Sequence, residues 1–210
     1  MENPGYSPHP FEPEQSELPP KANYDFTLDR RKFFKLTGGG LIVAFVIKDL
    51  LSFGNETLPS DASSMAGVES WIHIGEDGTV TVYTGKVEVG QNIRTSLSQI
   101  VAEELMVPVS SIKMIMGDMD LVPFDAGTFG SRTTPQMGTQ LRKAAATARN
   151  ALVDMATKKW NATGVKIENG TVVNIVTNEK ISYGALTKGE KLMITISDNV
   201  PVIAAKDWKV

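Results

Sequence analysis

The sequence predicts an α+β fold in which a mixed sheet with hairpins packs against two main helices. Apolar residues alternate with period two in several short runs, which is typical of strands. Two longer runs, 92–105 and 135–159, instead carry apolar residues at the three- and four-residue spacing of one helix face. The chain has 210 residues, 41% of them hydrophobic, which is enough for one domain of ordinary size with a real core.

The first two strands are expected to form a hairpin. The stretch WIHIGEDGTVTVYTG alternates on both sides of Asp77-Gly78, a dipeptide typical of tight hairpin turns. We expect strands over 71–74 and 80–84, so the folded part should begin at Trp71. His73 lies within the first of these strands, and we interpret it as structural.

The first helix follows over 92–105, and Pro108 ends it. On this helix Glu103 and Glu104 are interpreted as part of a solvated rim and not as an acid/base pair. The segment IKMIM, 112–116, is the next strand, and 117–134 has the composition of a loop.

The second helix begins near Pro135, which a first helical turn tolerates. Its alanine-rich stripe predicts close packing against a sheet. The stretch VKIENGTVVNI then predicts a second hairpin around Asn169-Gly170. A short helix over 182–186 and strand-like pieces complete the chain.

Composition excludes several kinds of site. The chain has no cysteine, so disulfides, thiolate metal sites, protein-bound iron–sulfur clusters and cysteine nucleophiles are excluded within it. Only His9 and His73 are histidines, which excludes a multi-histidine metal site. The net charge of -3 gives no basic footprint for nucleic acid. We predict neither a catalytic residue nor a metal ligand in this chain.

The N-terminal region predicts export. Residues 1–28 are proline-rich and polar, which is typical of a disordered tail. In 29–52, Arg30-Arg31 precede an uncharged run of 12 residues, 36–47, too short to cross a bilayer as a helix. This pattern predicts a twin-arginine-type signal, with cleavage left open, and a surface amphipathic helix is the alternative. Residues 53–69 read as a linker, followed by the folded domain, 70–210.

Two loops have the composition of ligand-binding segments. Gly90 and Gln91 lie at the start of the first helix, where free backbone N–H groups favour an anion. Gly130, Ser131, Arg132 and Thr133 gather flexible backbone, hydroxyls and a guanidinium before the second helix, which suits phosphate oxygens. The alternatives are an ordinary glycine-containing cap at the first loop and an anion-free capping loop at the second.

The two loops together resemble a known family. The stretch WIHIGEDGTVTVYTGKVEVGQNIRTSLSQIVAEELMVP, the strand IKMIMGD and the stretch GTFGSRTTPQMGTQLRKAAATAR are similar to the xanthine dehydrogenase/aldehyde oxidase family. The likeness is greatest to the molybdopterin-binding large subunit of the isoquinoline 1-oxidoreductase branch. It implies that the folded part is a partial molybdenum-cofactor-binding domain of an oxidoreductase that hydroxylates N-heterocycles or oxidises aldehydes, with water as oxygen donor.

The resemblance also implies cofactor contacts. The cofactor would be molybdopterin with molybdenum, in the cytosine dinucleotide form. Gln91 corresponds to the glutamine of the family's glycine–glutamine–glycine loop, and Gly130, Ser131 and Thr133 fall in a second loop beside the pterin and phosphate. Gly90 and Arg132 are assigned to the cofactor on the same reasoning. Asn92 departs from the family, which usually has glycine there.

The same resemblance sets expectations about partners and extent. The chain is expected to be an N-terminal fragment or split subunit, with the catalytic glutamate outside it. Its partners would be the remaining large-subunit domains, an iron–sulfur small subunit carrying the [2Fe–2S] clusters, a cytochrome c as a candidate electron acceptor, and a small-molecule substrate. We expect a periplasmic location or membrane association on the periplasmic side. The alternative is a non-catalytic exported binding or assembly module.

Overall fold

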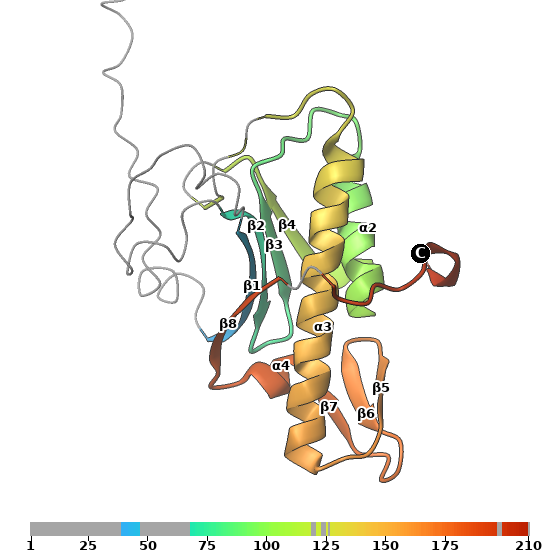
Figure 1. Cartoon of the computed structure of the whole chain (residues 1–210). Helices are drawn as coiled ribbons and strands as arrows, with labels where there is room; N and C mark the ends of the chain where they lie inside the picture. Colours follow the sequence, from blue (N-terminus) through green and yellow to red (C-terminus); the bar gives the residue numbers. More distant parts are fainter. Residues whose placement is uncertain are drawn as a thin grey trace, which may run out of the picture.

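Two sheets and two long helices make up the fold (Figure 1). The computed structural model describes residues 39–46, 68–118, 121–122, 125, 127–196 and 199–209. The larger sheet has five strands in the order β4-β3-β2-β1-β8. In that order the strands are Ile112–Met116, Val80–Thr84, Val68–Gly75, Gly40–Val46 and Lys191–Thr195. The β1–β2 and β2–β3 pairs are antiparallel, while β3–β4 and β1–β8 are parallel, so the predicted mixed sheet is confirmed.

The hairpin between β2 and β3 forms at Asp77-Gly78, as predicted. Gly75 N–H donates to the carbonyl of Thr79 at 3.0 Å and closes the turn. The carboxylate of Asp77 accepts a second hydrogen bond from Thr79 N–H at 2.9 Å. This local bonding explains why an Asp-Gly pair between two alternating runs is a reliable hairpin signal.

The two predicted helices cover one face of the larger sheet (Figure 1). Helix α2, Ile93–Leu105, packs against β4, and α3, Gly138–Trp160, packs against α2, β1 and β2. The alanine stripe of α3 is buried, as the small side chains allow close approach. Gly138 marks a close approach between the helices, because a Cβ there would lie 2.8 Å from Cδ1 of Ile100.

Strand β1 was not predicted. Gly40–Val46 lie inside the segment that the sequence assigned to an export signal, yet they pair with β2 on one side and β8 on the other. The side chains of Leu41, Ile42 and Val43 are fully buried. The expectation that the folded part begins at Trp71 is therefore wrong: β2 begins at Val68, within the segment assigned as a linker, and β1 precedes it.

Glycine at position 40 has a physical reason in this strand. Gly40 has a φ of +135°, and a Cβ there would lie 2.4 Å from the carbonyl oxygen of Ile74. His73 Nε2 lies 3.1 Å from the carbonyl oxygen of Gly39, which ties β2 to the start of β1. Glycine at position 40 therefore permits a close approach between two strands.

The smaller sheet is antiparallel, in the order β5-β6-β7. Its strands, Val165–Glu168, Thr171–Asn174 and Lys180–Ser182, include the predicted hairpin at Asn169-Gly170. Helix α4, Tyr183–Thr187, follows, with Ser182 as its N-cap, and matches the predicted short helix. Two single 3₁₀ turns, η2 over Val109–Ser111 and η4 over Ala205–Asp207, complete the elements outside the site.

Glu103 and Glu104 do not form a solvated rim, which corrects the interpretation from sequence. Glu104 is fully buried, and its carboxylate accepts hydrogen bonds from Arg142, Arg149 and the backbone N–H of Ile203. Glu103 accepts from Lys209 N–H at 2.8 Å. Both carboxylates thus hold the C-terminal segment, which runs beside α2 in Figure 1. Helical periodicity had placed them at the edge of the apolar face, but that edge is covered by distant residues.

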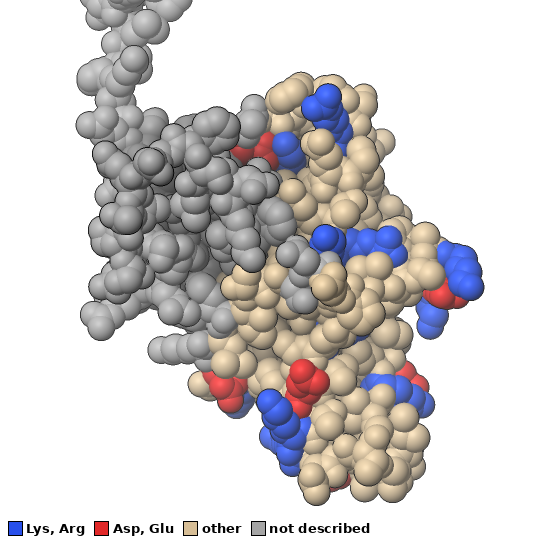
Figure 2. Space-filling view, viewed as in Figure 1, with Lys and Arg blue, Asp and Glu red and all other residues tan. Residues whose placement is uncertain are grey.

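No helix in the described ranges is long and apolar enough to span a membrane. The tail 1–28, Arg30-Arg31 and linker residues 53–67 lie outside the described residues. On the face drawn in Figure 2, basic and acidic side chains are scattered among uncharged ones.

Candidate functional site

The two loops singled out from the sequence lie side by side. Loop 85–92 joins β3 to α2, and loop 125–132 leads into α3. Lys86 Nζ lies 2.7 Å from Asp125 Oδ1 and also donates to the carbonyl of Gly127 at 2.7 Å. Val87 N–H donates to the hydroxyl of Thr128 at 2.8 Å. These contacts join segments that are distant in the sequence, as a common site requires.

The start of α2 already contains an anion. Glu88 Oε1 accepts from the N–H groups of Gly90 at 2.7 Å and Asn92 at 3.1 Å, and Oε2 accepts from Arg94 N–H at 3.0 Å. The hydrogen bond from Arg94 is the largest cause that lowers the pKa of Glu88 from its ordinary value. The free N–H groups expected to favour a ligand anion at Gly90 are thus bonded to the chain's own carboxylate.

Gln91 stabilises its own loop. Its Oε1 accepts from Val89 N–H at 2.6 Å, and its Nε2 donates to the carbonyl of Val87 at 2.9 Å. Asn92 next to it has a φ of +60°, a conformation that asparagine tolerates better than most residues. The departure from glycine at Asn92 therefore leaves the tight turn before α2 intact.

The second loop enters α3 through an unusual backbone. Gly130 and Ser131 have φ values of +64° and +54°, and a non-glycine residue in that region is under strain. A π-helical turn, η3 over Thr133–Met137, precedes α3 directly. Such turns occur frequently at functional sites. Ser96 of α2 and Thr134 bring the two helix starts together, with their hydroxyl oxygens 3.3 Å apart.

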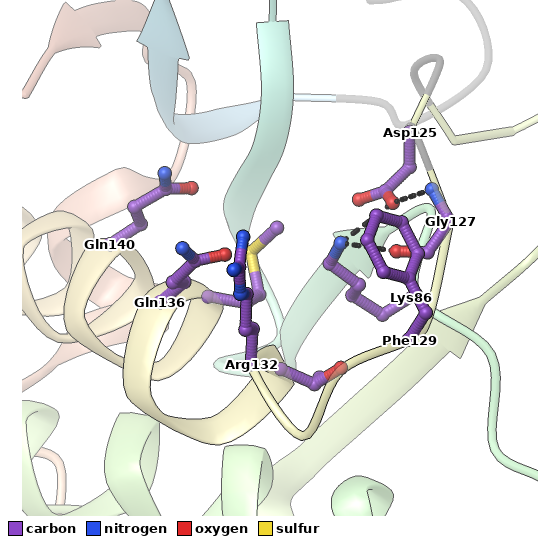
Figure 3. Close-up of a pocket in the computed structure, with 9 residues that line it drawn as sticks. Lys86, Asp125, Gly127, Phe129, Arg132, Gln136 and Gln140 are labelled. Atoms are coloured by element: carbon purple, nitrogen blue, oxygen red, sulfur yellow. Dashed lines mark hydrogen bonds and ion pairs between the residues drawn. The ribbon is translucent and has the colours of Figure 1, made fainter.

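A cavity of about 140 Å³ lies between these elements (Figure 3). Lys86, Asp125 and Gly127 are joined on one side, and Arg132, Gln136 and Gln140 line the other. Its remaining lining residues are Phe129, Thr133 and Met137. The Lys86–Asp125 pair is largely buried, with side-chain exposures of 15% and 5%, so its two charges neutralise each other inside the wall.

Two groups in the cavity have no described partner. The carbonyl oxygen of Gln140 is buried and accepts no hydrogen bond from any described residue. Arg132 is exposed, and among the described residues none accepts a hydrogen bond from its guanidinium. An unpaired acceptor inside and a cation at the rim are complementary to a polar, anionic ligand.

The structure brings together only some of the predicted site residues. Arg132 and Thr133 line the cavity, whereas Gly130 and Ser131 shape the loop beside it. Gly90 and Gln91 do not line the cavity, and their contacts are within their own loop. The described residues contain no cluster of three or more His, Asp or Glu able to hold a metal ion.

Sequence reasoning missed Lys86, Gln136 and Gln140. The two glutamines are four residues apart at a helix start, a spacing that places both amides on one face. That spacing, next to a loop rich in hydroxyl donors, was the available signal. Lys86 had no signal of its own, because its partner Asp125 is distant in the sequence.

Comparisons with known proteins agree with this arrangement. The family model described as "Molybdopterin cofactor-binding domain" matches residues 21–210. A nicotinate dehydrogenase subunit of Pseudomonas putida is 36% identical over 66% of this chain and 12% of its own length. The beta subunit of isoquinoline 1-oxidoreductase of Brevundimonas diminuta is 31% identical over 70% of this chain and 21% of its own length.

A solved structure shows the same fold. CO dehydrogenase from Oligotropha carboxidovorans superposes with a TM-score of 0.50 and 24% identity, over 61% of this chain and 17% of that chain. The chain thus spans a small part of the length of its relatives. The resemblance stated from the loop motifs is confirmed: the chain belongs to the molybdopterin cofactor-binding domain family, within the large subunits of the xanthine dehydrogenase and aldehyde oxidase enzymes.

Proposed function

We propose that this chain supplies part of the cofactor cradle of a molybdenum hydroxylase. The whole enzyme would oxidise N-heterocycles or aldehydes with water as the oxygen donor, and this chain would be an N-terminal portion or split piece of its large subunit. The cavity at the start of α3 carries this proposal, since it combines an exposed guanidinium with a buried unpaired acceptor.

The residues present fit such a cofactor. Gln140 offers an orphaned acceptor to the ring nitrogens of a pterin, and Arg132 offers a cation to its phosphate. Thr133, buried beside them, adds a hydroxyl that can donate or accept. The family's molybdenum is held by sulfurs of the pterin, so a wall without His or Cys ligands is compatible with it. When bound, the cofactor supplies the redox chemistry, and the protein supplies binding and orientation.

Loop 85–92 would hold its shape by internal hydrogen bonds. Glu88 and Gln91 bond to the backbone of their own loop, which organises the turn without help from a ligand. Preorganisation of this kind reduces the entropy lost when a cofactor binds. We infer that Gln91 acts on the cofactor from a rigid loop, and that Gly90 is needed for the turn, with a φ of +97°.

The partners proposed for the whole enzyme are those that the family resemblance implies. They are an iron–sulfur small subunit with [2Fe–2S] clusters, the remaining large-subunit domains, and a cytochrome c as a candidate acceptor. The cytosine dinucleotide form of the cofactor is also part of the proposal. In support, a relative in Paenarthrobacter nicotinovorans is named as the gamma subunit of a dehydrogenase complex.

We also propose export by the twin-arginine route to the periplasm. The support is Arg30-Arg31 before an uncharged run. A reporter fused after the full chain tests it: wild type should reach the periplasm, and R30K/R31K should remain in the cytoplasm. Equal export of both would contradict the route.

Metal and pterin content test the main proposal. The chain is purified with its co-expressed partner subunits, molybdenum is measured by mass spectrometry, and the released pterin by fluorescence after oxidation. We expect both in the wild type, with cytidine monophosphate released on acid hydrolysis. Ser131→Ala and Gln91→Ala should lower the content, with the exposed Thr163→Ala as control. Molybdenum and pterin at background level would overturn the proposal and favour the binding or assembly module.

A further inference from the structure

The carbonyl oxygen of Gln140 is the one buried polar side-chain atom that the described fold leaves without a partner. Gln140 is the third residue of α3, directly after the π-helical turn over Thr133–Met137. Among buried side-chain nitrogen and oxygen atoms of the described residues, only its Oε1 has no hydrogen-bond partner. Buried acceptors in native proteins are nearly always satisfied, so each exception calls for an explanation.

The surroundings of Gln140 restrict what can satisfy it. Phosphate and carboxylate oxygens only accept hydrogen bonds, so an anionic group cannot serve as its partner. The required group is an N–H or O–H donor. On the same side of the cavity Arg132 is exposed at the rim and presents a cation (Figure 3). The cavity therefore has an acceptor for a hydrogen-bond donor in its interior, Gln140, and a cation for an anionic group at its rim, Arg132.

The apolar residues that line the cavity favour a ligand of planar shape. Met137 is almost fully buried in the wall, while Phe129 is 64% exposed at the loop. An exposed aromatic ring beside a small cavity offers a flat surface on which a planar group can lie. The ligand that fits is a planar heterocycle with an N–H or amino edge, joined to an anionic group.

We propose that Gln140 recognises the donor edge of the cofactor's heterocycle, while Arg132 binds the attached phosphate. This assignment rests on the proposed cofactor function and specifies which residue reads which part of the ligand. A pterin and a cytosine share the required chemistry, because both present an amino group beside ring nitrogens. Gln140 is a binding residue in this proposal and takes no part in the reaction.

Gln140→Leu tests the proposal through two measurements, the unfolding temperature of the complex without pterin and the rate at which the loaded complex releases pterin. In complex purified from cells that make no molybdopterin, the variant should unfold at the same temperature as wild type or higher, because a buried unpaired acceptor has been removed. In loaded complex, the pterin should leave about tenfold faster, the effect of losing one hydrogen bond. A residue with a merely structural role would instead lower the unfolding temperature of the unloaded complex.

Two further variants complete the design. Gln140→Glu keeps an acceptor in the same place and should retain most of the pterin. Gln99→Leu makes the same change as Gln140→Leu on α2, outside the cavity lining, and should release pterin at the wild-type rate. Equal pterin release from Gln140→Leu and wild type would overturn the assignment and leave the proposed function standing. Wild-type complex without pterin would overturn the proposed function itself.

Complex produced in cells that cannot attach the cytidine nucleotide to molybdopterin distinguishes the two candidate heterocycles, the pterin and the cytosine. If Gln140 binds the pterin, Gln140→Leu should accelerate release of both the mononucleotide and the dinucleotide forms. If Gln140 binds the cytosine, the acceleration should appear only with the dinucleotide form. No acceleration with either form would contradict the proposal.

Discussion

The carboxylate of Glu104 lies 2.8 Å from the guanidinium of Arg149, and the side chain of Glu104 is fully buried between α2 and α3. Arg142 approaches the other carboxylate oxygen, also at 2.8 Å. Both arginines extend to the C-terminal segment: Arg149 donates to the carbonyl of Pro201 and Arg142 to that of Ile203. One buried acid thus fixes two helices and the segment that leaves them.

Removing Glu104 should destabilise the protein strongly. Glu104→Ala leaves two guanidinium groups without their carboxylate, and breaking a buried ion pair costs about 3–5 kcal/mol. The free energy of unfolding in urea measures this. Glu168→Ala is the matched control, because its ion pair with Lys166 is about half exposed to water and should contribute far less to stability. Equal losses in the two variants would contradict the role of Glu104.

The turn before α2 should loosen in acid. Hydrogen bonds from backbone N–H groups, the one from Arg94 foremost, lower the pKa of Glu88 from 4.5. A depressed carboxyl pKa contributes stability that is complete above 4.5 and is lost as the pH falls through the lower folded value. Amide hydrogen exchange at Gly90, Asn92 and Arg94 should therefore show additional opening below pH 4.5. Glu88→Gln should remove this pH dependence.

His73 should make the fold sensitive to milder acid. Its burial is the largest cause that lowers its pKa from 6.5. The unfolded chain therefore binds more protons than the folded chain below pH 6.5, and stability falls from there until the folded pKa is passed. Urea unfolding at a series of pH values measures the slope. His73→Gln keeps a donor for the carbonyl of Gly39 but does not titrate. If stability depends on pH in this variant as it does in the wild type, a group other than His73 causes the dependence.

Strand β1 should persist in the mature protein. Leu41, Ile42 and Val43 are fully buried, and β1 lies between β2 and β8, so removing it would leave β8 without its partner. We expect any processing of the N-terminus to occur before Gly39. Intact mass of the protein purified from its native host measures this, and a mature chain beginning after residue 47 would refute it.

A substitution in β1 measures independently how much this strand contributes to the stability of the core. Val43→Asp places an unpaired carboxyl in the core and should cost about 3–5 kcal/mol of unfolding free energy. Thr195→Asp on strand β8 is the control, because Thr195 is exposed and should tolerate the charge. Similar stability of the two variants would mean that β1 contributes little to the core.

Local patterns predicted most of the elements. The hairpins at Asp77-Gly78 and Asn169-Gly170, both long helices and the 112–116 strand follow from turn chemistry and periodicity, which act over a few residues. For the site, Arg132 and Thr133 were recognised from the donors before α3. Gln140 was not, because its spacing from Gln136 does not show that its carbonyl oxygen is buried without a partner, which depends on how the fold packs.

The sequence by itself determined the α+β class, the two hairpins, strand β4, helices α2, α3 and α4, and the family, since each depends on local spacing or on contiguous motifs. The tertiary structure decided the role of Gly40–Val46, because a short apolar run suits an export signal as well as a buried strand until its partners are known. It also decided the roles of Glu88 and Glu104. A carboxylate is a solvated surface group, a helix cap or a buried anchor according to which N–H groups surround it, and for Glu104 these come from distant parts of the chain.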